Sequence, residues 1–308
     1  MNKSTKTRYA IFQILIEVFK KNKNFETVLN KFISGSNFNK KEISFINNVC
    51  LNSMRRNIHC NIILNQYIKK KLKINDFILL SSAIVQIAYL NIKPYAVVNE
   101  TVNVAKKAKI FPGFINAILK NILKDIESIK KLEIKLNDFP KWFVNELNIK
   151  TKINFSSFIN TFYEHPSLHL VFKTEQDLNS FKEVHTKSSK NSAFVEVKKN
   201  IEKIQNYNQG NWWVQDFSSM LPLSINSETK DQNILDICAA PGGKSFQLLS
   251  NNYDVVLNDK SINRIKTLKS NLVRLKFNAR ILNKDFIKFS NEEKYDVIII
   301  DSPCSAIG

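Results

Sequence analysis

Residues 234–245 read ILDICAAPGGKS, a short apolar run followed by a turn of small residues. Ile234, Leu235 and Ile237 have the pattern of a buried strand. Asp236 lies near the carboxyl end of that strand, where an acid can hold a polar or cationic ligand group. A strand that breaks into a glycine turn and reopens as a helix lets a ligand approach bare backbone. The segment therefore predicts a strand–turn–helix unit at a nucleoside-binding site.

Two other nucleotide-binding patterns do not fit this segment. A P-loop requires G-x-x-x-x-G-K-[ST], and Gly243-Lys244-Ser245 matches its end, but Cys238 occupies its first position. Pro241 also removes a backbone N–H that such a loop would direct at a phosphate. The dinucleotide fingerprint G-x-G-x-x-G does not occur either. An ordinary strand–turn–helix junction is the alternative interpretation.

Three further apolar segments downstream carry an acid at or near their carboxyl ends. They cover residues 254–259, 279–285 and 295–301. The four acids of this pattern are Asp236, Asp259, Asp285 and Asp301. Ligands of open α/β sheets bind outside the carboxyl ends of the strands, so the pattern predicts one shared site. Asp259 lies about 20 residues beyond the turn, a spacing typical of a carboxylate that accepts hydrogen bonds from ribose hydroxyls.

At this point a family resemblance becomes specific. The segments LDICAAPGGK, VLND, NKD and DSPCSAIG together resemble the S-adenosyl-L-methionine-dependent RNA methyltransferases that modify carbon 5 of cytosine. The segment QDFSSML at residues 215–221 is similar to the one that precedes the cofactor turn of that family. The resemblance implies that Asp259 holds the ribose, Asp285 lies beside the adenine, and Asp301 faces the methionine end and the target base. It implies that the turn residues around the cofactor are Cys238, Ala239, Ala240, Pro241, Gly242, Gly243 and Lys244.

Carbon-5 methylation of cytosine requires a cysteine. A thiolate that adds to carbon 6 makes carbon 5 nucleophilic enough to take a methyl group, after which a base removes the proton and the thiol leaves. By its position after a strand, Cys304 is a candidate for this role, and a plain buried thiol is the alternative. The resemblance implies instead an accessory role for Cys304 in product release, because the attacking cysteine of the family lies downstream in a Thr-Cys pair. This sequence contains no such pair, so we expect a C-terminally truncated chain that is not itself active.

The N-terminal part, residues 1–129, has apolar residues at helical spacing and no strand-like alternation, which predicts an all-α domain of about seven helices. Its stretches SFINNVCLNSMRR, SSAIVQIAYLNIKPYAVVNETVNVAKK and GFINAILKNIL resemble the NusB-like RNA-binding domain. That domain precedes the methyltransferase module in the bacterial 16S ribosomal RNA cytosine methyltransferase B family, which this chain resembles. Arg8, Arg55 and Arg56 are the candidates for phosphate contacts, with a solvated helix face as the alternative for each.

The charge is unevenly distributed. The chain has 46 Lys and Arg against 27 Asp and Glu, a net charge of +19. Residues 1–135 contain 24 basic and 8 acidic residues, or +16, and the remainder contains 22 and 19, or +3. A basic helical part next to a transferase module favours a polyanionic partner. With the resemblance, we expect small-subunit ribosomal RNA as the partner.

The middle of the chain, residues 130–205, predicts a small α/β linker domain. Residues 139–143, FPKWF, resemble the segment that opens the linker of the family, whereas residues 168–173, LHLVFK, lack the Arg and Asn that the family has there. Short strands are predicted at residues 168–172 and 193–197. Trp212 and Trp213 could stack on a base, but packing against a sheet is the favoured interpretation. Residues 206–308 complete a multidomain chain as a partial Rossmann-like α/β methyltransferase domain.

Composition excludes several other classes. A hydrophobic content of 44% is typical of a globular chain, and no apolar run approaches the length of a membrane span. The four cysteines have neither metal-ligand spacing nor a disulfide pattern. We therefore expect a monomer in the reducing cytoplasm, with no metal and no membrane contact. The alternatives are a non-catalytic RNA-binding protein with a vestigial cofactor pocket, or a methyltransferase that acts on transfer RNA.

Overall fold

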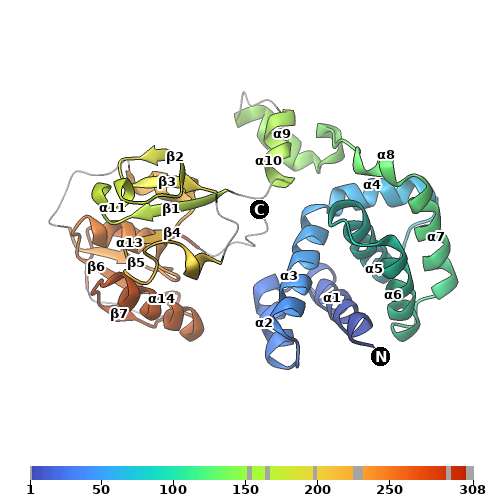
Figure 1. Cartoon of the computed structure of the whole chain (residues 1–308), viewed down its shortest axis with the longest axis horizontal. Coiled ribbons are helices and arrows are strands. Elements are labelled where there is room, and N and C mark those ends of the chain that lie inside the picture. Colours follow the sequence, from blue (N-terminus) through green and yellow to red (C-terminus); the bar gives the residue numbers. More distant parts are fainter. Residues whose placement is uncertain are drawn as a thin grey trace. The chain divides into compact units, whose positions relative to one another are not determined.

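The computed structural model describes residues 2–150, 155–163, 167–196, 200–224, 232–288 and 293–302. The chain divides into two compact units on either side of residue 165 (Figure 1). The first unit is helical, and the second contains two four-stranded sheets. This arrangement confirms the expected fold class, a helical part followed by α/β structure. The predicted domain boundaries at residues 129 and 205 stay predictions.

The described residues of the first unit form helices throughout. Their bounds are α1 (Lys3–Phe19), α2 (Phe25–Ser34), α3 (Lys40–Arg55), α4 (Asn57–Tyr67), α5 (Ile74–Ile84), the π-helix η1 (Val85–Tyr89), α6 (Pro94–Lys107), α7 (Pro112–Lys124), α8 (Ile126–Lys130), the 3-10 helix η2 (Leu136–Asp138), α9 (Lys141–Lys150) and α10 (Phe155–Tyr163).

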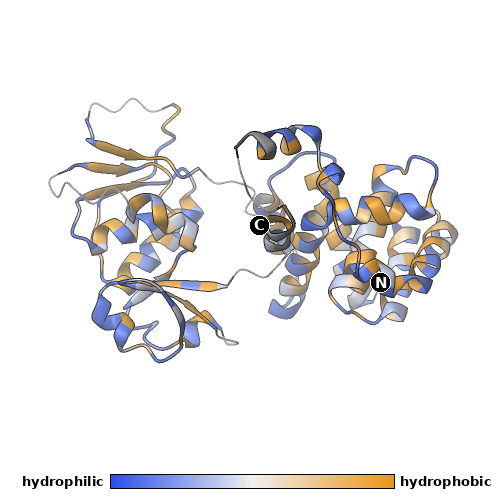
Figure 2. Ribbon diagram, turned by 90° about the horizontal axis from the view of Figure 1, so that it is seen from above, coloured by the Kyte–Doolittle hydropathy of each residue, from blue (hydrophilic) through white to orange (hydrophobic). Residues whose placement is uncertain are grey.

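Local sequence signals explain where several of these helices begin. The side chains of Asn2, Asn24 and Asn39 accept hydrogen bonds from backbone N–H groups in the first turns of α1, α2 and α3. Pro94 and Pro112 occupy the first turns of α6 and α7, where a missing N–H costs nothing. The helices are amphipathic, and apolar and polar residues alternate along them (Figure 2).

Helix α5 and the π-helix η1 form the centre of this unit. All residues from 78 to 88 are buried, as the apolar sequence of this segment requires. The core around them also contains the buried thiols Cys50 and Cys60. These two cysteines are therefore core residues.

The first sheet of the second unit is antiparallel and has the strand order β2-β3-β1-β4. Its strands are β1 (Leu168–Phe172), β2 (Val184–Ser189), β3 (Ser192–Val195) and β4 (Trp212–Val214), with α11 (Glu175–Asn179) and the 3-10 helix η3 (Ile201–Lys203) between them. The predicted strand at residues 168–172 is confirmed. Trp212 and Trp213 are 0% and 2% exposed, which confirms that they pack in the fold.

The second sheet is parallel and has the order β7-β6-β5-β8. Its strands are β5 (Ile234–Asp236), β6 (Val255–Asn258), β7 (Ile281–Leu282) and β8 (Val297–Ile299), and the helices of this part are α12 (Phe217–Ser224), α13 (Gly243–Ser250) and α14 (Ile262–Leu275). The four strands lie in the segments that the sequence predicts. Ser261 caps α14 as expected, because its hydroxyl accepts a hydrogen bond from the N–H of Arg264.

Strand β8 is apolar over its length. Among the described strands it lies at an edge of the sheet and pairs with β5. Ile298 is 53% exposed and Ile300 is 66% exposed. The described residues therefore leave apolar side chains at this edge partly uncovered.

The two sheets of the second unit are joined by direct contacts. The guanidinium of Arg274, near the end of α14, donates hydrogen bonds of 3.0 Å to the carbonyls of Tyr207 and Trp212. Gly210 has a φ of +74°, and a Cβ there would lie 1.9 Å from the carbonyl oxygen of Arg274. Because a side chain does not fit at this contact, glycine allows α14 to pack directly against the segment before β4.

Candidate functional site

The turn between β5 and α13 is shaped by its glycines. Gly242 has a φ of +122°, and a Cβ at this position would lie 1.9 Å from the ring of Phe246. A Cβ on Gly243 would meet the side chain of Gln215 at 3.4 Å, an ordinary contact. The first glycine is therefore required by the backbone conformation and by the ring packed beneath the turn. Gly242 is therefore explained by the fold itself, without a ligand.

Asp236 ends β5 in a buried position. It is 1% exposed, and the hydroxyl of Ser245 donates a 2.6 Å hydrogen bond to its Oδ2. Burial raises the pKa of Asp236 to about 6, although the hydrogen bonds from Ser245 and from the N–H of Cys238 favour the charged form. The carboxylate of Asp301 is near enough to raise this pKa further, and Lys244 lowers it.

Asp259 follows β6 and is also covered. Its side chain is 4% exposed, and its Oδ1 accepts a 2.8 Å hydrogen bond from the N–H of Ser261. Arg264 of α14 places Nη1 3.3 Å from Oδ2, and its Nη2 donates to the carbonyl of Ala240 in the turn. Arg264 therefore ties this acid to the turn. Among the described residues, Oδ2 of Asp259 receives no hydrogen bond.

Two asparagines join the carboxyl ends of β5, β6 and β7. The side chain of Asn258 donates to the carbonyls of Ile237 and Lys284 at 2.9 and 3.2 Å. The side chain of Asn283 donates to the carbonyl of Asp259 at 2.7 Å. These bonds hold the loops after the three strands together. They fix the backbone from which Asp259 and the next acid, Asp285, extend.

Asp285 and Asp301 are the two more accessible acids. Asp285 forms a 2.8 Å ion pair with Lys260, and this interaction lowers the pKa of Asp285. Asp301 has a side chain that is 58% exposed, and its Oδ2 lies 2.5 Å from Nζ of Lys244. The same Nζ donates to the hydroxyl of Ser219 at 2.7 Å, so Lys244 joins α12 to the residue after β8.

Cys238 lies among these charged groups. Burial raises the pKa of its thiol, the carboxylates of Asp259 and Asp236 raise it further, and Arg264 lowers it. A thiol beside two carboxylates is a poor thiolate, so Cys238 is suited to packing against a ligand and not to nucleophilic attack. The structure thus brings Asp236, Cys238, Lys244, Asp259 and Asp301 into one electrostatically coupled cluster. Asp285 follows β7, the strand next to β6 in the sheet.

Three residues that hold this cluster were not predicted from the sequence. They are Ser219, Asn258 and Arg264. Ser219 lies in the QDFSSML segment, which offered a signal for it. Asn258 likewise lies in the VLND segment, whereas Arg264 carried no signal, because its contacts depend on how α14 packs against the turn. Cys304, the predicted accessory residue, lies outside the described residues, and its role stays a prediction.

The three predicted RNA-contacting arginines are held within the helical unit. Nε of Arg8 donates to Gln86 at 2.8 Å, and its Nη1 donates to Ser4 at 2.6 Å. The guanidinium carbon of Arg56 lies 3.8 Å and 4.8 Å from the ring centroids of two tyrosines, Tyr89 and Tyr163. Arg55, at the end of α3, is half-buried. The structure does not bring Arg8 together with the other two, and their RNA contacts stay predictions.

Two kinds of feature are absent from the part of the chain that the structure describes. Within it, no group of three or more His, Cys, Asp or Glu residues could hold a metal ion. None of its helices is long and apolar enough to cross a membrane.

Comparisons with known proteins agree with this geometry. The NusB family model matches residues 5–124, and the 16S rRNA methyltransferase RsmB/F model matches residues 223–308. Ribosomal RNA small subunit methyltransferase B of Pasteurella multocida (strain Pm70) is 26% identical, over 98% of this chain and 73% of that protein. Probable ribosomal RNA small subunit methyltransferase B of Coxiella burnetii (strain RSA 493 / Nine Mile phase I) is 24% identical, over 88% of this chain and 69% of that protein.

A solved structure has a similar fold. The crystal structure of PH0851 superposes with a TM-score of 0.57 at 14% sequence identity, and the match covers 99% of this chain and 75% of that chain. At this identity the likeness concerns the fold alone. Residues 5–124 therefore match the NusB family and residues 223–308 match the 16S rRNA methyltransferase RsmB/F family, which agrees with the family resemblance of the sequence.

Proposed function

We propose that this protein serves the methylation of carbon 5 of a cytosine in small-subunit ribosomal RNA, with S-adenosyl-L-methionine as the methyl donor. The observation that supports this most directly is the cluster at the carboxyl ends of the parallel strands. Asp236 ends β5, Asp259 and Asp301 follow β6 and β8, and their charges act on one another or on Cys238. Converging acids beside a glycine turn suit a ligand that carries ribose hydroxyls and positive charge.

The residues present fit this cofactor. Oδ2 of Asp259 is buried and receives no hydrogen bond among the described residues, so a ribose hydroxyl would satisfy it. We assign Asp259 to the ribose, Asp285 to the adenine, and the segment from Cys238 to Lys244 to the methionine part. When bound, S-adenosyl-L-methionine supplies a methyl group on a positively charged sulfur.

The protein would contribute position and electrostatics to the transfer. Lys244, held by Ser219 and paired with Asp301, places a fixed positive charge next to an accessible carboxylate. We assign Asp301 to the side of the site where the target base enters. That base must be unpaired or flipped, because stacking covers the ring carbons that react. We assign Cys304 to product release, as the resemblance implies, and we place the reaction in the reducing cytoplasm.

Isothermal titration calorimetry tests the cofactor assignment on the full 308-residue chain. We expect saturable binding of S-adenosyl-L-methionine, and loss of a ribose contact in Asp259→Asn should weaken it by about tenfold or more. Asp254→Asn, an exposed acid outside the cluster, is the matched control. Absence of any binding heat would favour an RNA-binding protein with a vestigial pocket.

The position of methylation needs a separate test. Small-subunit ribosomal RNA from cells that lack the gene should be missing one 5-methylcytidine, and mass spectrometry of its nucleosides measures this. A change confined to transfer RNA would contradict the proposed substrate. None of the four cysteines of the chain follows a threonine, so we expect no methyl transfer by the 308-residue chain itself. Normal turnover by that chain would overturn this expectation.

A further inference from the structure

Helices α6 and α7 pack side by side (Figure 1). They leave a groove of about 360 Å³ between them. Residues from α6 at helical spacing line one wall, and residues from α7 at the same spacing line the other. The lining consists of Tyr95, Val98, Asn99, Val102, Asn116, Lys120 and Leu123. The groove thus has an apolar floor with polar groups along its walls.

The groove contains an aromatic ring in an unusual position. Tyr95, in the first turn of α6, is 81% exposed, whereas tyrosines generally bury most of the ring. Val98 and Val102 follow it on the same face of α6 and are half-buried. A flat ligand that stacked on this ring would also cover the two valines. Nucleobases are flat and stack on aromatic side chains without regard to sequence.

The polar groups of the groove have no partners within the described residues. Neither a hydrogen bond nor an ion pair is formed there by the side chains of Asn99, Asn116 or Lys120. An asparagine amide both donates and accepts, as the edges of bases require, and a lysine ammonium pairs with phosphate. These three side chains offer what one nucleotide needs besides a stacking surface.

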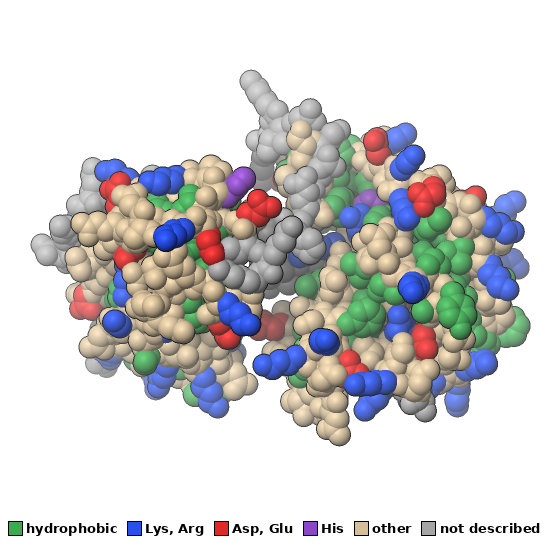
Figure 3. Space-filling view, in the orientation of Figure 1, with side chains coloured by type: hydrophobic (Ala, Val, Ile, Leu, Met, Phe, Trp, Pro, Cys, Tyr) green, Lys and Arg blue, Asp and Glu red, His purple; other side chains and the backbone are tan. Residues whose placement is uncertain are grey.

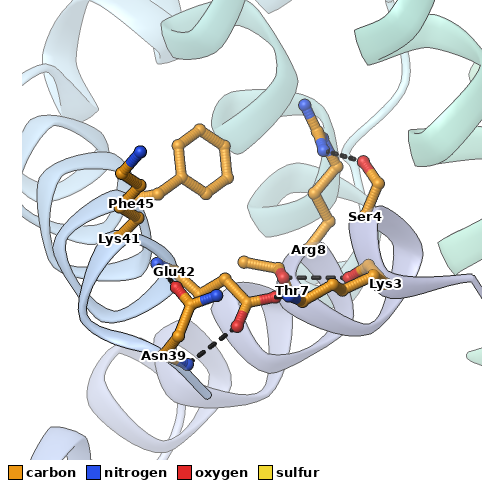
Figure 4. Close-up of a pocket in the computed structure, with 8 residues that line it drawn as sticks. All are labelled: Lys3, Ser4, Thr7, Arg8, Asn39, Lys41, Glu42 and Phe45. Carbon is orange, nitrogen blue, oxygen red and sulfur yellow. Dashed lines mark hydrogen bonds and ion pairs between the residues drawn. The ribbon is translucent and has the colours of Figure 1, made fainter.

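A second hollow in the same unit differs in this respect. It measures about 470 Å³ and lies between the beginnings of α1 and α3 (Figure 4). Three of its four charged groups already have partners inside the protein, since Lys3 pairs with Glu42 at 3.5 Å and Arg8 donates to Ser4, and Lys41 is the fourth. Asn39 is used to cap α3. A ligand there would have to displace internal contacts, whereas the groove between α6 and α7 offers unpaired groups.

Charge indicates which class of partner fits the groove. Residues 94–124 contain five lysines and one acid, Glu100. Glu100 is 7% exposed and accepts hydrogen bonds from Asn2 and Thr5, so its charge faces the interior. Lysines and arginines are spread over the visible face of the helical unit (Figure 3). Because the residues around the groove are strongly basic, they favour a polyanion as the partner over a protein surface that has few acidic residues.

We propose that the α6–α7 groove binds an unpaired nucleotide of the RNA, with the base stacked on Tyr95 and the phosphate on Lys120. Asn99 and Asn116 would contact the edges of the base. This inference rests on the proposed RNA substrate and adds to it a binding site remote in sequence from the cofactor turn. It predicts that the helical unit prefers single-stranded over duplex RNA, because paired bases are not available for stacking.

The test measures binding of the full chain to a fluorescently labelled single-stranded RNA of mixed sequence and to the same strand in a duplex. Tyr95→Ala should weaken single-strand binding by about tenfold, whereas Tyr95→Phe should remain within about twofold of the unmodified chain. Lys120→Gln should lower the slope of log affinity against log salt by about 0.7. Both positions are on the surface, so the three variants should keep the circular dichroism of the unmodified chain.

Matched controls use residues outside the groove. Trp142→Ala removes another exposed aromatic side chain, and Lys31→Gln removes another exposed lysine. Binding losses in the controls equal to those in Tyr95→Ala and Lys120→Gln would overturn the groove while leaving the RNA substrate in place. A change in self-association with unchanged RNA binding would also overturn it and would assign the groove to a second copy of the chain. Failure of the unmodified chain to bind either RNA would instead contradict the proposed substrate.

Discussion

Replacing Asp236 by asparagine should stabilise the second unit at neutral pH. Asp236 is 1% exposed at the end of β5, and its burial raises its pKa from an ordinary 3.8 to about 6. The fold therefore favours the neutral carboxylic acid over the carboxylate that exists at pH 7. Asparagine has nearly the same shape, carries no charge, and retains an oxygen that accepts the hydrogen bond from Ser245.

The size of the effect follows from the two pKa values. Each tenfold change in an acid dissociation constant corresponds to about 1.4 kcal/mol, so the change from 3.8 to about 6 corresponds to about 3 kcal/mol. The amide of asparagine cannot accept the N–H of Cys238 as well as the carboxylate does, which costs about 1 kcal/mol. Asp236→Asn should therefore raise the free energy of unfolding of this unit by about 2 kcal/mol.

The sign of the pH dependence is fixed by the direction of the shift. Because the pKa of Asp236 is higher in the folded chain, its contribution to stability is fully present below about pH 3.8 and is lost as the pH rises through about 6. In the asparagine variant, this contribution does not depend on pH. The two proteins should therefore differ most above about pH 6 and converge toward about pH 4.

Urea unfolding followed by tryptophan fluorescence measures this prediction. Trp212 and Trp213 are buried in the second unit, whereas Trp142 is already 68% exposed and changes little on unfolding. Asp254→Asn, which removes an exposed acid from the same unit, should stay within about 0.5 kcal/mol of the unmodified chain. A loss of stability in Asp236→Asn above about pH 6, or an unchanged difference between pH 4 and pH 7, would refute the reasoning.

Three other substitutions test the contacts around the site and in the helical unit. Gly242→Ala should lower the stability of the second unit by about 3 kcal/mol or more, because φ is +122° and the new Cβ would meet the ring of Phe246; the same fluorescence assay measures it. Arg264→Met should cost about 3 kcal/mol and weaken cofactor binding, since it leaves the buried Asp259 unpaired, and Arg264→Lys should restore part of both losses in calorimetry. Arg56→Ala should lower the thermal stability of the helical unit by about 1–2 kcal/mol, measured by circular dichroism, because the guanidinium lies against two tyrosine rings; unchanged melting would show that this stacking contributes little.

The sequence was sufficient to place the strands of the second sheet and their acids along the chain. Each of the four strands carries a run of apolar residues and ends near an acid, and both signals are local. The cap at Ser261 and the first-turn prolines of α6 and α7 are local signals as well. Predictions of this kind succeed because hydrogen bonds within a few residues determine them.

The contacts that hold the site together could not be predicted from short stretches of the sequence. Arg264 reaches Asp259 from one turn of helix away, but its second contact, with the carbonyl of Ala240, depends on the packing of α14 against the turn. The side chain of Asn258 donates hydrogen bonds to the carbonyls of Ile237 and Lys284, which lie in the segments after β5 and β7. The exposure of Ile298 likewise depends on which strands flank β8. Such features require the register and order of the whole sheet.

The energetics of the strand ends explain why these acids mark a functional site. At neutral pH, a carboxylate at Asp236 costs stability, and Asp259 remains buried only because Arg264 compensates its charge. An amide side chain at position 236 would fold more easily at neutral pH. Groups that a fold retains at such a cost are concentrated where they bind or react. The variant Asp236→Asn tests both sides of this argument. A gain in its free energy of unfolding would measure what the charge of Asp236 costs the fold, and a loss of affinity for S-adenosyl-L-methionine would measure what the same charge contributes to binding.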